Sequence, residues 1–95
     1  MELSLTRSLQ ALADPTRRAI LQMLNQRDMT AGEIGARFAI SASSVSHHLS
    51  VLKSAELVRS ERNGQTIVYS LNTTVMQEFY QELLQLFNVG GDNHA

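Results

Sequence analysis

The stretch TAGEIGARFAISASSVSHHLSVLKSA, residues 30–55, predicts two short helices joined by a tight corner. Thr30 can cap the first helix, and Glu33 follows at the spacing of a capping box, in which each side chain bonds the other residue's backbone N–H. Ser41 can cap the second helix by accepting from a backbone N–H two or three residues later. The second helix then has an apolar seam at i, i+4 and i+7, which consists of Val45, Leu49 and Leu52. The stretch therefore encodes a capped pair of amphipathic helices.

The opposite face of the second helix carries small polar side chains, namely Ser43, Ser46, His47 and Ser50. Side chains with so little bulk let the helix approach another surface closely. A helix with such a face, placed behind a capped leader helix, is typical of a helix-turn-helix, in which the second helix enters the DNA major groove. On this stretch alone, a plain helix hairpin in a small helical protein is an equally good interpretation.

A β-hairpin is predicted directly after this stretch. Asn63-Gly64 is the dipeptide best suited to a two-residue type I′ turn, in which both central residues need positive φ. With this turn at the tip, Val58 pairs across from Tyr69 on an apolar strand face. A helix-turn-helix followed at once by a tight hairpin has the order of a winged helix, and this order favours the DNA-binding interpretation over the helix hairpin.

Two helices are predicted before the stretch. Residues 3–13 carry a leucine stripe at helical spacing, which consists of Leu5, Leu9 and Leu12. Asp14 can cap the next helix, with Pro15 at its first position, where a missing N–H costs nothing. Arg17 and Arg18 lie near the start of that helix and oppose its macrodipole, so both need partners. An acid such as Asp14 is the favoured partner, and a phosphate is the alternative.

A last helix is predicted over residues 73–88, where Asn72 can cap its start. Its apolar stripe is wider than contact with one neighbouring element needs. Together with the leucine stripe of residues 3–13, it leaves apolar area that has no partner inside one chain. We therefore expect a homodimer built from these two terminal helices. The residues expected in its interface are Leu5, Leu9, Leu12, Phe79, Leu83 and Phe87.

Length and composition fit one folded domain over residues 1–95. The chain has no Cys, which excludes disulfides and thiolate metal ligands. No apolar run is long enough to span a bilayer and no export signal is visible, so we expect a cytoplasmic protein. The net charge of −1 counts against a nucleic-acid binder. Between residues 34 and 55, however, the only charged side chains are Arg37 and Lys53, so this segment is locally positive.

Three spaced segments carry a resemblance to a known family: LADPTRRAILQML (residues 12–24), SASSVSHHLSVLKSAELV (residues 41–58) and RNGQTIVYSLNTTV (residues 62–75). Together with the long last helix, they resemble the small bacterial repressors of the ArsR/SmtB family, and within it the metal-independent SdpR-like autorepressors. The resemblance implies a mainly α (α+β) fold, a winged helix-turn-helix of about five helices with one β-hairpin wing. It also implies a dimeric, autoregulatory transcriptional repressor that binds double-stranded DNA at a pseudo-palindromic operator.

Carried over residue by residue, the resemblance places one face of the recognition helix and the tip of the wing on DNA. The implied contacts are Ser43, Ser44, Ser46 and His47 on the helix, and Arg62 and Gln65, which flank the predicted turn. Many relatives have Arg or Lys on this helix where this chain has Ser44 and His47. In this respect the chain departs from the family pattern, and the resemblance does not establish how strongly the helix reads base edges. His48 resembles an inward-leaning histidine, which we expect to pack and hydrogen-bond instead of touching DNA.

No metal, cofactor or catalytic site is expected. Soft-metal sensors of this family use a Cys-x-Cys pair where this chain has Thr30 and Gly32, and zinc sensors use ligands along the last helix, which here contains no His. His47 and His48 point about 100° apart on a helix, so they cannot share one ion. The nearby serines and histidines lack the orienting acid and oxyanion hole of a hydrolase. A winged helix used only for protein contacts remains the alternative function.

Overall fold

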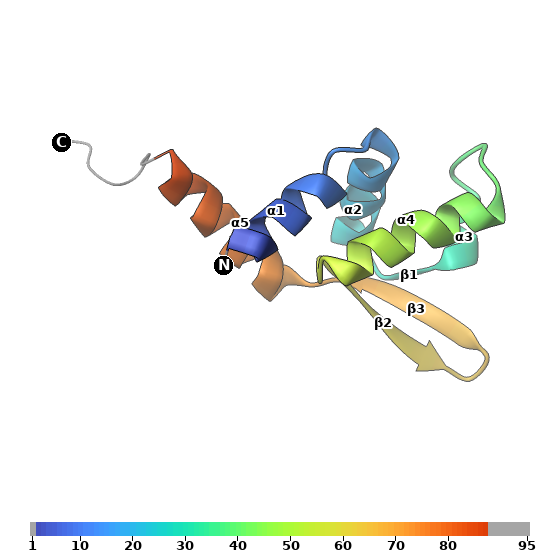
Figure 1. The fold of residues 1–95 in the computed structure, drawn as a ribbon. Helices are drawn as coiled ribbons and strands as arrows, with labels where there is room; N and C mark the ends of the chain where they lie inside the picture. Colours follow the sequence, from blue (N-terminus) through green and yellow to red (C-terminus); the bar gives the residue numbers. More distant parts are fainter. Residues whose placement is uncertain (1, 88–95) are drawn as a thin grey trace.

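The computed structural model describes residues 2–87, which form five helices and three strands (Figure 1). In chain order these elements are α1 (Glu2–Ala11), α2 (Pro15–Gln26), β1 (Met29–Thr30), α3 (Ala31–Gly35), α4 (Ala42–Ser54), β2 (Val58–Asn63), β3 (Thr66–Leu71) and α5 (Thr73–Leu86). The predicted architecture, a winged helix-turn-helix of about five helices with a hairpin wing, is confirmed. α3 and α4 form the helix-turn-helix, and β2 and β3 form the wing.

All four predicted helix caps are present, because each depends only on residues close together in the chain. Asp14, Ser41 and Asn72 each accept from the backbone N–H three residues later, at 3.1, 3.1 and 3.3 Å. Thr30 and Glu33 form the complete capping box at the start of α3, with bonds of 3.1 and 2.9 Å. These caps set where three of the longer helices and the leader helix begin.

The sheet has a third strand that was not predicted. β1 pairs antiparallel with β3, with Met29 opposite Tyr69 and Thr30 opposite Val68, so the strand order is β1-β3-β2. Met29 is almost fully buried in this position. Thr30 caps α3 while it pairs with β3, and the wing is thereby joined directly to the first helix of the helix-turn-helix.

The register predicted for the wing is wrong by two residues. Val58 lies opposite Leu71, and Asn63 pairs with Thr66, so the two loop residues are Gly64 and Gln65. Gly64 has a φ of 71°, whereas φ is negative at Asn63 and Gln65. A type I′ turn needs positive φ at both central residues, so this turn is not of that type. Positive φ at the first loop position alone is the pattern of a type II′ turn, which favours Gly there. A shift of two residues keeps every side chain on its predicted face.

The hydrophobic core lies between α2, α4 and the sheet. The predicted seam of α4 is buried in it, together with residues from α2, β1, α3 and β2; the largest fully buried side chains are Ile20, Met29, Ile34, Leu49, Leu52 and Leu57. α5, in contrast, contains no buried residue over its described length. It lies beside α1 and extends away from the rest of the fold (Figure 1). The two terminal helices therefore form an arm with incompletely covered apolar side chains.

Candidate nucleic-acid interface

The outward face of α4 is exposed along most of its length. Ser43, Ser46, His47, Ser50 and Lys53 are all exposed on it, while the opposite seam is buried in the core. Helical spacing places these residues on one continuous stripe. Ser50 and Lys53 extend this stripe beyond the residues predicted to contact DNA. In the sequence, Ser50 already belonged to the small polar face of the second helix. Lys53 was one of the two cations between residues 34 and 55.

A cluster of three hydroxyl groups surrounds the N-terminal end of α4. The Oγ of Ser41 donates to the Oγ of Ser44 at 3.1 Å and lies 3.1 Å from the Oγ of Ser43, and it also accepts from the backbone N–H of Ser44. Ser44 is half-buried. Because its oxygen accepts from Ser41, the hydroxyl hydrogen of Ser44 remains available to an acceptor outside the cluster.

The two adjacent histidines occupy different environments. His47 is exposed on the outward stripe, whereas the side chain of His48 is only 16% exposed. The Nδ1 of His48 lies 3.3 Å from Nη1 of Arg17 and 3.9 Å from Oδ2 of Asp14. The ring centroids of the two histidines are 5.8 Å apart and the planes are tilted by 54°. The prediction that His48 leans inward and hydrogen-bonds is confirmed, and His47 is the histidine that faces outward.

The guanidinium groups of Arg17 and Arg18 hydrogen-bond to backbone carbonyls and not to Asp14, the acid that was the favoured partner. Arg17 donates to the carbonyl oxygens of Ala11 and Gln10, at 2.7 and 3.0 Å, and Arg18 donates to that of Leu12 at 2.6 Å. The last carbonyls of a helix lack intrahelical partners and form the negative end of its dipole, so α1 supplies what an acid or a phosphate was expected to supply.

Asp14 caps the N-terminal end of α2. The backbone N–H of Arg17 donates to its carboxylate, which is the main reason that the pKa of Asp14 lies below its usual value. The backbone N–H of Thr16 and the positive charge of Arg17 also lower this pKa, while partial desolvation opposes these effects.

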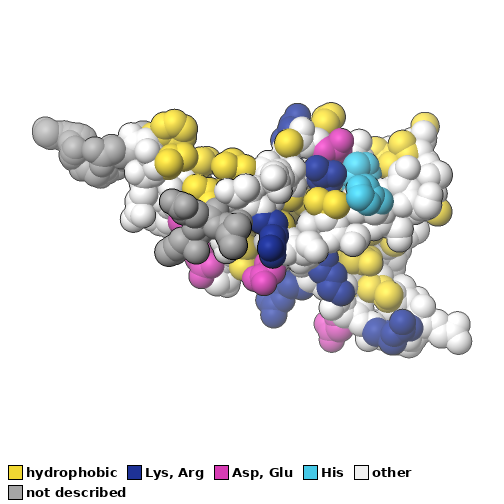
Figure 2. Space-filling model, in the orientation of Figure 1, with side chains coloured by type: hydrophobic (Ala, Val, Ile, Leu, Met, Phe, Trp, Pro, Cys, Tyr) yellow, Lys and Arg dark blue, Asp and Glu magenta, His cyan; other side chains and the backbone are white. Residues whose placement is uncertain are grey.

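The wing presents exposed polar and cationic side chains at its tip. Arg62 is exposed one residue before the end of β2 and Gln65 is exposed inside the turn, so neither residue flanks the turn as predicted. Arg59, which the prediction omitted, is exposed on the face opposite to the buried Val58. Figure 2 shows Lys and Arg side chains along the wing on the same side of the molecule as the histidines of α4. The strand alternation of residues 58–63 carried this signal, because it places Arg59 outward.

The comparison with known proteins places this arrangement in a family. The sequence profile of the bacterial regulatory protein arsR family matches residues 14–60, which contain α2, the helix-turn-helix and the start of the wing. The chain is 51% identical over 83 residues to the transcriptional repressor SdpR of Bacillus subtilis, covering 87% of this chain and 92% of SdpR. The chain belongs to the ArsR family. This ArsR-family chain is thus a winged helix-turn-helix transcription regulator and not an enzyme.

Solved structures agree with this assignment. The ArsR-like transcriptional regulator from Rhodococcus sp. RHA1 superimposes with a TM-score of 0.81 at 27% identity, over 90% of this chain and 80% of the other. The homodimeric winged helix-turn-helix DNA-binding domain Mb0332 from Mycobacterium bovis superimposes with a TM-score of 0.73 at 25% identity, over 97% of this chain and 86% of that domain.

The terminal arm of this ArsR-family chain carries the residues predicted for a dimer interface. Leu9 and Phe87 are 42% and 67% exposed, and the other predicted residues, Leu5, Leu12, Phe79 and Leu83, are half-buried. Tyr80 and Leu86 on α5 are also exposed, although the prediction omitted them from the interface. Figure 2 shows hydrophobic side chains gathered over this arm. The apolar area expected from the sequence is therefore present on the surface of the single chain.

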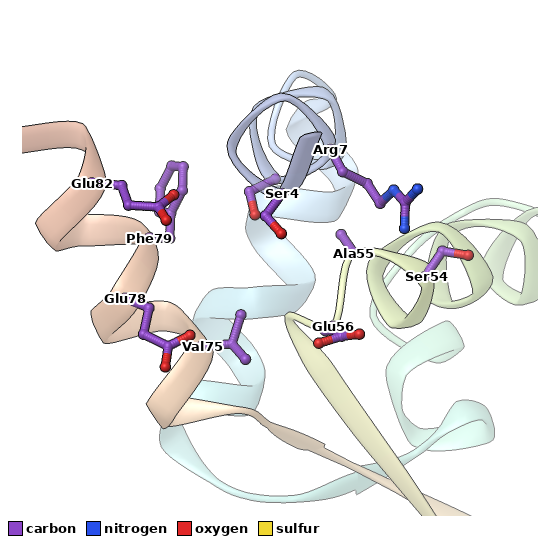
Figure 3. Close-up of a pocket in the computed structure, with 10 residues that line it drawn as sticks. Ser4, Arg7, Ser54, Ala55, Glu56, Val75, Glu78, Phe79 and Glu82 are labelled. Atoms are coloured by element: carbon purple, nitrogen blue, oxygen red, sulfur yellow. The ribbon is translucent and has the colours of Figure 1, made fainter. Parts of the chain in front are cut away.

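A cavity of about 110 Å³ lies between α1, the C-terminal end of α4 and α5 (Figure 3). Arg7 comes from α1, Glu56 from the turn that follows α4, and Glu78 and Glu82 from α5. Within residues 2–87, these acids and the other His and Asp side chains form no group of three or more that could hold a metal ion. No helix within this part of the chain is both long and apolar enough to cross a membrane.

Proposed function

We propose that this ArsR-family protein is a dimeric repressor that binds a pseudo-palindromic operator in double-stranded DNA. In this proposal the two recognition helices enter successive major grooves about 34 Å apart on one side of the duplex. The observation that carries it is the placement of the exposed α4 stripe and the cationic wing on the same side of the molecule. The helix supplies short donors and acceptors, and the wing supplies positive charge beside them.

Each residue at this surface then has a defined part. Ser43, Ser46 and His47 meet base edges in the major groove, since they are exposed and short enough for close approach. Ser44 contributes its remaining hydroxyl hydrogen to a phosphate or a base acceptor. Arg62 and Gln65 contact the backbone or the minor groove beside the site, and we add Arg59 to these two predicted residues.

Dimerisation through α1 and α5 accounts for the exposed apolar arm. In our proposal the predicted interface residues pack against their copies in a second protomer, and Tyr80 and Leu86 join them. The homodimeric state of the Mb0332 domain supports this arrangement for a related fold. Burying the arm would also enlarge the core of a domain that has little margin on its own.

The relationship to SdpR supports a repressor function. We propose repression, including repression of the protein's own promoter in the cytoplasm, because SdpR is a transcriptional repressor and the chain spans nearly all of it. We also propose that no metal regulates binding, since the chain has no Cys and its last helix has no His. A protein-contact module is the competing function, and it predicts no salt-dependent affinity for DNA.

The test is a titration of the protein against its own promoter fragment and against a scrambled fragment at two salt concentrations. We expect preference for the promoter and an affinity that falls steeply with salt. Arg62→Gln should reduce the salt slope by roughly one per subunit. Glu61→Gln on the same strand is the matched control, and removing this negative charge should leave binding unchanged or tighten it. Equal affinity for both fragments, or no binding at low salt, would favour the protein-contact module.

A further inference from the structure

Arg17 joins the end of α1 to the recognition helix through a single side chain. Two of its guanidinium nitrogens hold the last carbonyls of α1, at Gln10 and Ala11, and the third nitrogen lies 3.3 Å from Nδ1 of His48 on α4. Its backbone N–H meanwhile bonds the cap residue Asp14 at the start of α2. Arg17 therefore makes polar contacts with two other helices, α1 and α4, and with the cap of its own helix α2.

The chemistry of this contact fixes the state of the histidine. A guanidinium has only donors, so a hydrogen bond with Arg17 requires Nδ1 of His48 to accept, which leaves the proton on Nε2. A proton on Nδ1 of His48 would remove this bond. The protonated Nδ1 would then face the Oδ2 of Asp14, which lies 3.9 Å away. Since the His48 side chain is largely buried, its ring has little freedom to find other partners.

We propose that Arg17 is a positioning residue that sets the placement of the recognition helix relative to α1. This inference rests on the proposed function, because α1 matters in this way only if it lies in the dimer interface. A dimer can engage two half-sites only when its two recognition helices keep a fixed separation and orientation. The path from the interface through α1, Arg17 and His48 reaches α4 one residue from His47, which faces outward.

Arginine suits this position because its planar fork presents several donors at fixed angles. Lysine keeps the charge but has one nitrogen, which cannot hold both α1 carbonyls and the His48 ring in the same geometry. Arg18 offers a matched comparison within the same helix turn. It also donates to a carbonyl, that of Leu12 directly after α1, but makes no described hydrogen bond to α4.

The DNA test compares a duplex with one half-site against a duplex with the complete palindrome, using the promoter sequence that the wild-type protein selects. We expect Arg17→Lys to remain a dimer and to keep its half-site affinity within about twofold, while its affinity for the complete site falls about tenfold, because misaligned helices lose the second contact. Arg18→Lys should leave both affinities unchanged. Equal losses on both duplexes, or no loss on either, would overturn the positioning role.

The histidine offers a second and independent test through rescue. His48→Asn keeps an acceptor oxygen close to the position of Nδ1, whereas His48→Leu keeps bulk but has no acceptor. We expect the asparagine variant to retain preference for the complete site and the leucine variant to lose it. If both variants bind the complete site alike, the Arg17 contact has no positioning role.

A DNA-free measurement separates this inference from the proposed function. Nitrogen-15 NMR of the wild-type protein should show His48 with an unprotonated Nδ1 and a protonated Nε2 at neutral pH, and Arg17→Lys should disturb this pattern. A protonated Nδ1 in the wild type would overturn the inference even if the protein binds its operator. Absence of DNA binding by a wild type with the expected ring state would overturn the proposed function, and with it the positioning role.

Discussion

The backbone N–H of Leu57 donates to the carbonyl oxygen of Leu52 at 3.0 Å and closes the C-terminal end of the recognition helix. Within the loop that this bond closes, the backbone N–H of Glu56 donates to the carbonyl oxygen of Lys53 at 2.9 Å. Together the two bonds form a Schellman motif, whose residue after the C-cap adopts the left-handed conformation and is usually Gly. Here that residue is Glu56, with a φ of 63°. The end of α4 is therefore strained at a position where a side chain is unfavourable.

We predict that Glu56→Gly stabilises the protein by about 1 kcal/mol, because Gly adopts this conformation without the Cβ penalty. Urea denaturation of the two proteins provides the measurement. Glu56→Ala is the matched control, since it removes the carboxylate but keeps a Cβ, and it should leave the free energy of unfolding nearly unchanged. If Ala stabilised as much as Gly, the charge of Glu56 and not its backbone conformation would be responsible.

The lowered pKa of Asp14 predicts a specific loss of stability in acid. Its carboxylate accepts from the backbone N–H of Arg17 in the folded state, so the unfolded chain binds a proton more readily than the folded one. The stabilisation is complete above the ordinary pKa of 3.8 and is lost as the pH falls through the lower folded value. Asp14→Asn keeps a good cap but cannot ionise, so the stability of the wild type relative to this variant should fall on acidification below 3.8. Thermal melts of both proteins across that range should show this convergence; a constant difference would contradict it.

Leu9→Glu should shift the protein from dimer to monomer, because it places a charge in the proposed apolar interface. Leu9 is 42% exposed in the single chain, so the substitution should spare the core of the monomer. Ile40→Glu is the matched control, since Ile40 is 39% exposed but lies at the corner between α3 and α4. Sedimentation at micromolar concentration should separate the two variants. Finding the wild type only as a 10.5 kDa species would exclude the dimer.

The sequence predicted those features whose cause is local. The caps at Asp14, Thr30, Ser41 and Asn72 each depend on residues within one helical turn, and all formed as expected. The strand β1 could not be predicted in the same way. It consists of two residues, too few for any alternation, and it exists because β3 approaches it from far along the chain.

The errors at the wing and at α2 have similar origins. Asn63-Gly64 favours one turn locally, but strand pairing across six positions of each strand fixed the turn one residue later. The partners of Arg17 and Arg18 were missed because helix-end carbonyls have no signature in the sequence of side chains. At the candidate interface, alternation along β2 could have identified Arg59, and the resemblance alone did not.

Within residues 2–87, the strand order β1-β3-β2 leaves β2 as an edge strand with unpaired backbone groups. Such an edge can template pairing with a strand of another chain, and charged side chains oppose this association. Arg59, Glu61 and Arg62 all lie exposed on this short strand. The charges of Arg59 and Arg62, which suit contact with a DNA backbone, therefore also oppose aggregation of the unbound protein through strand pairing at β2.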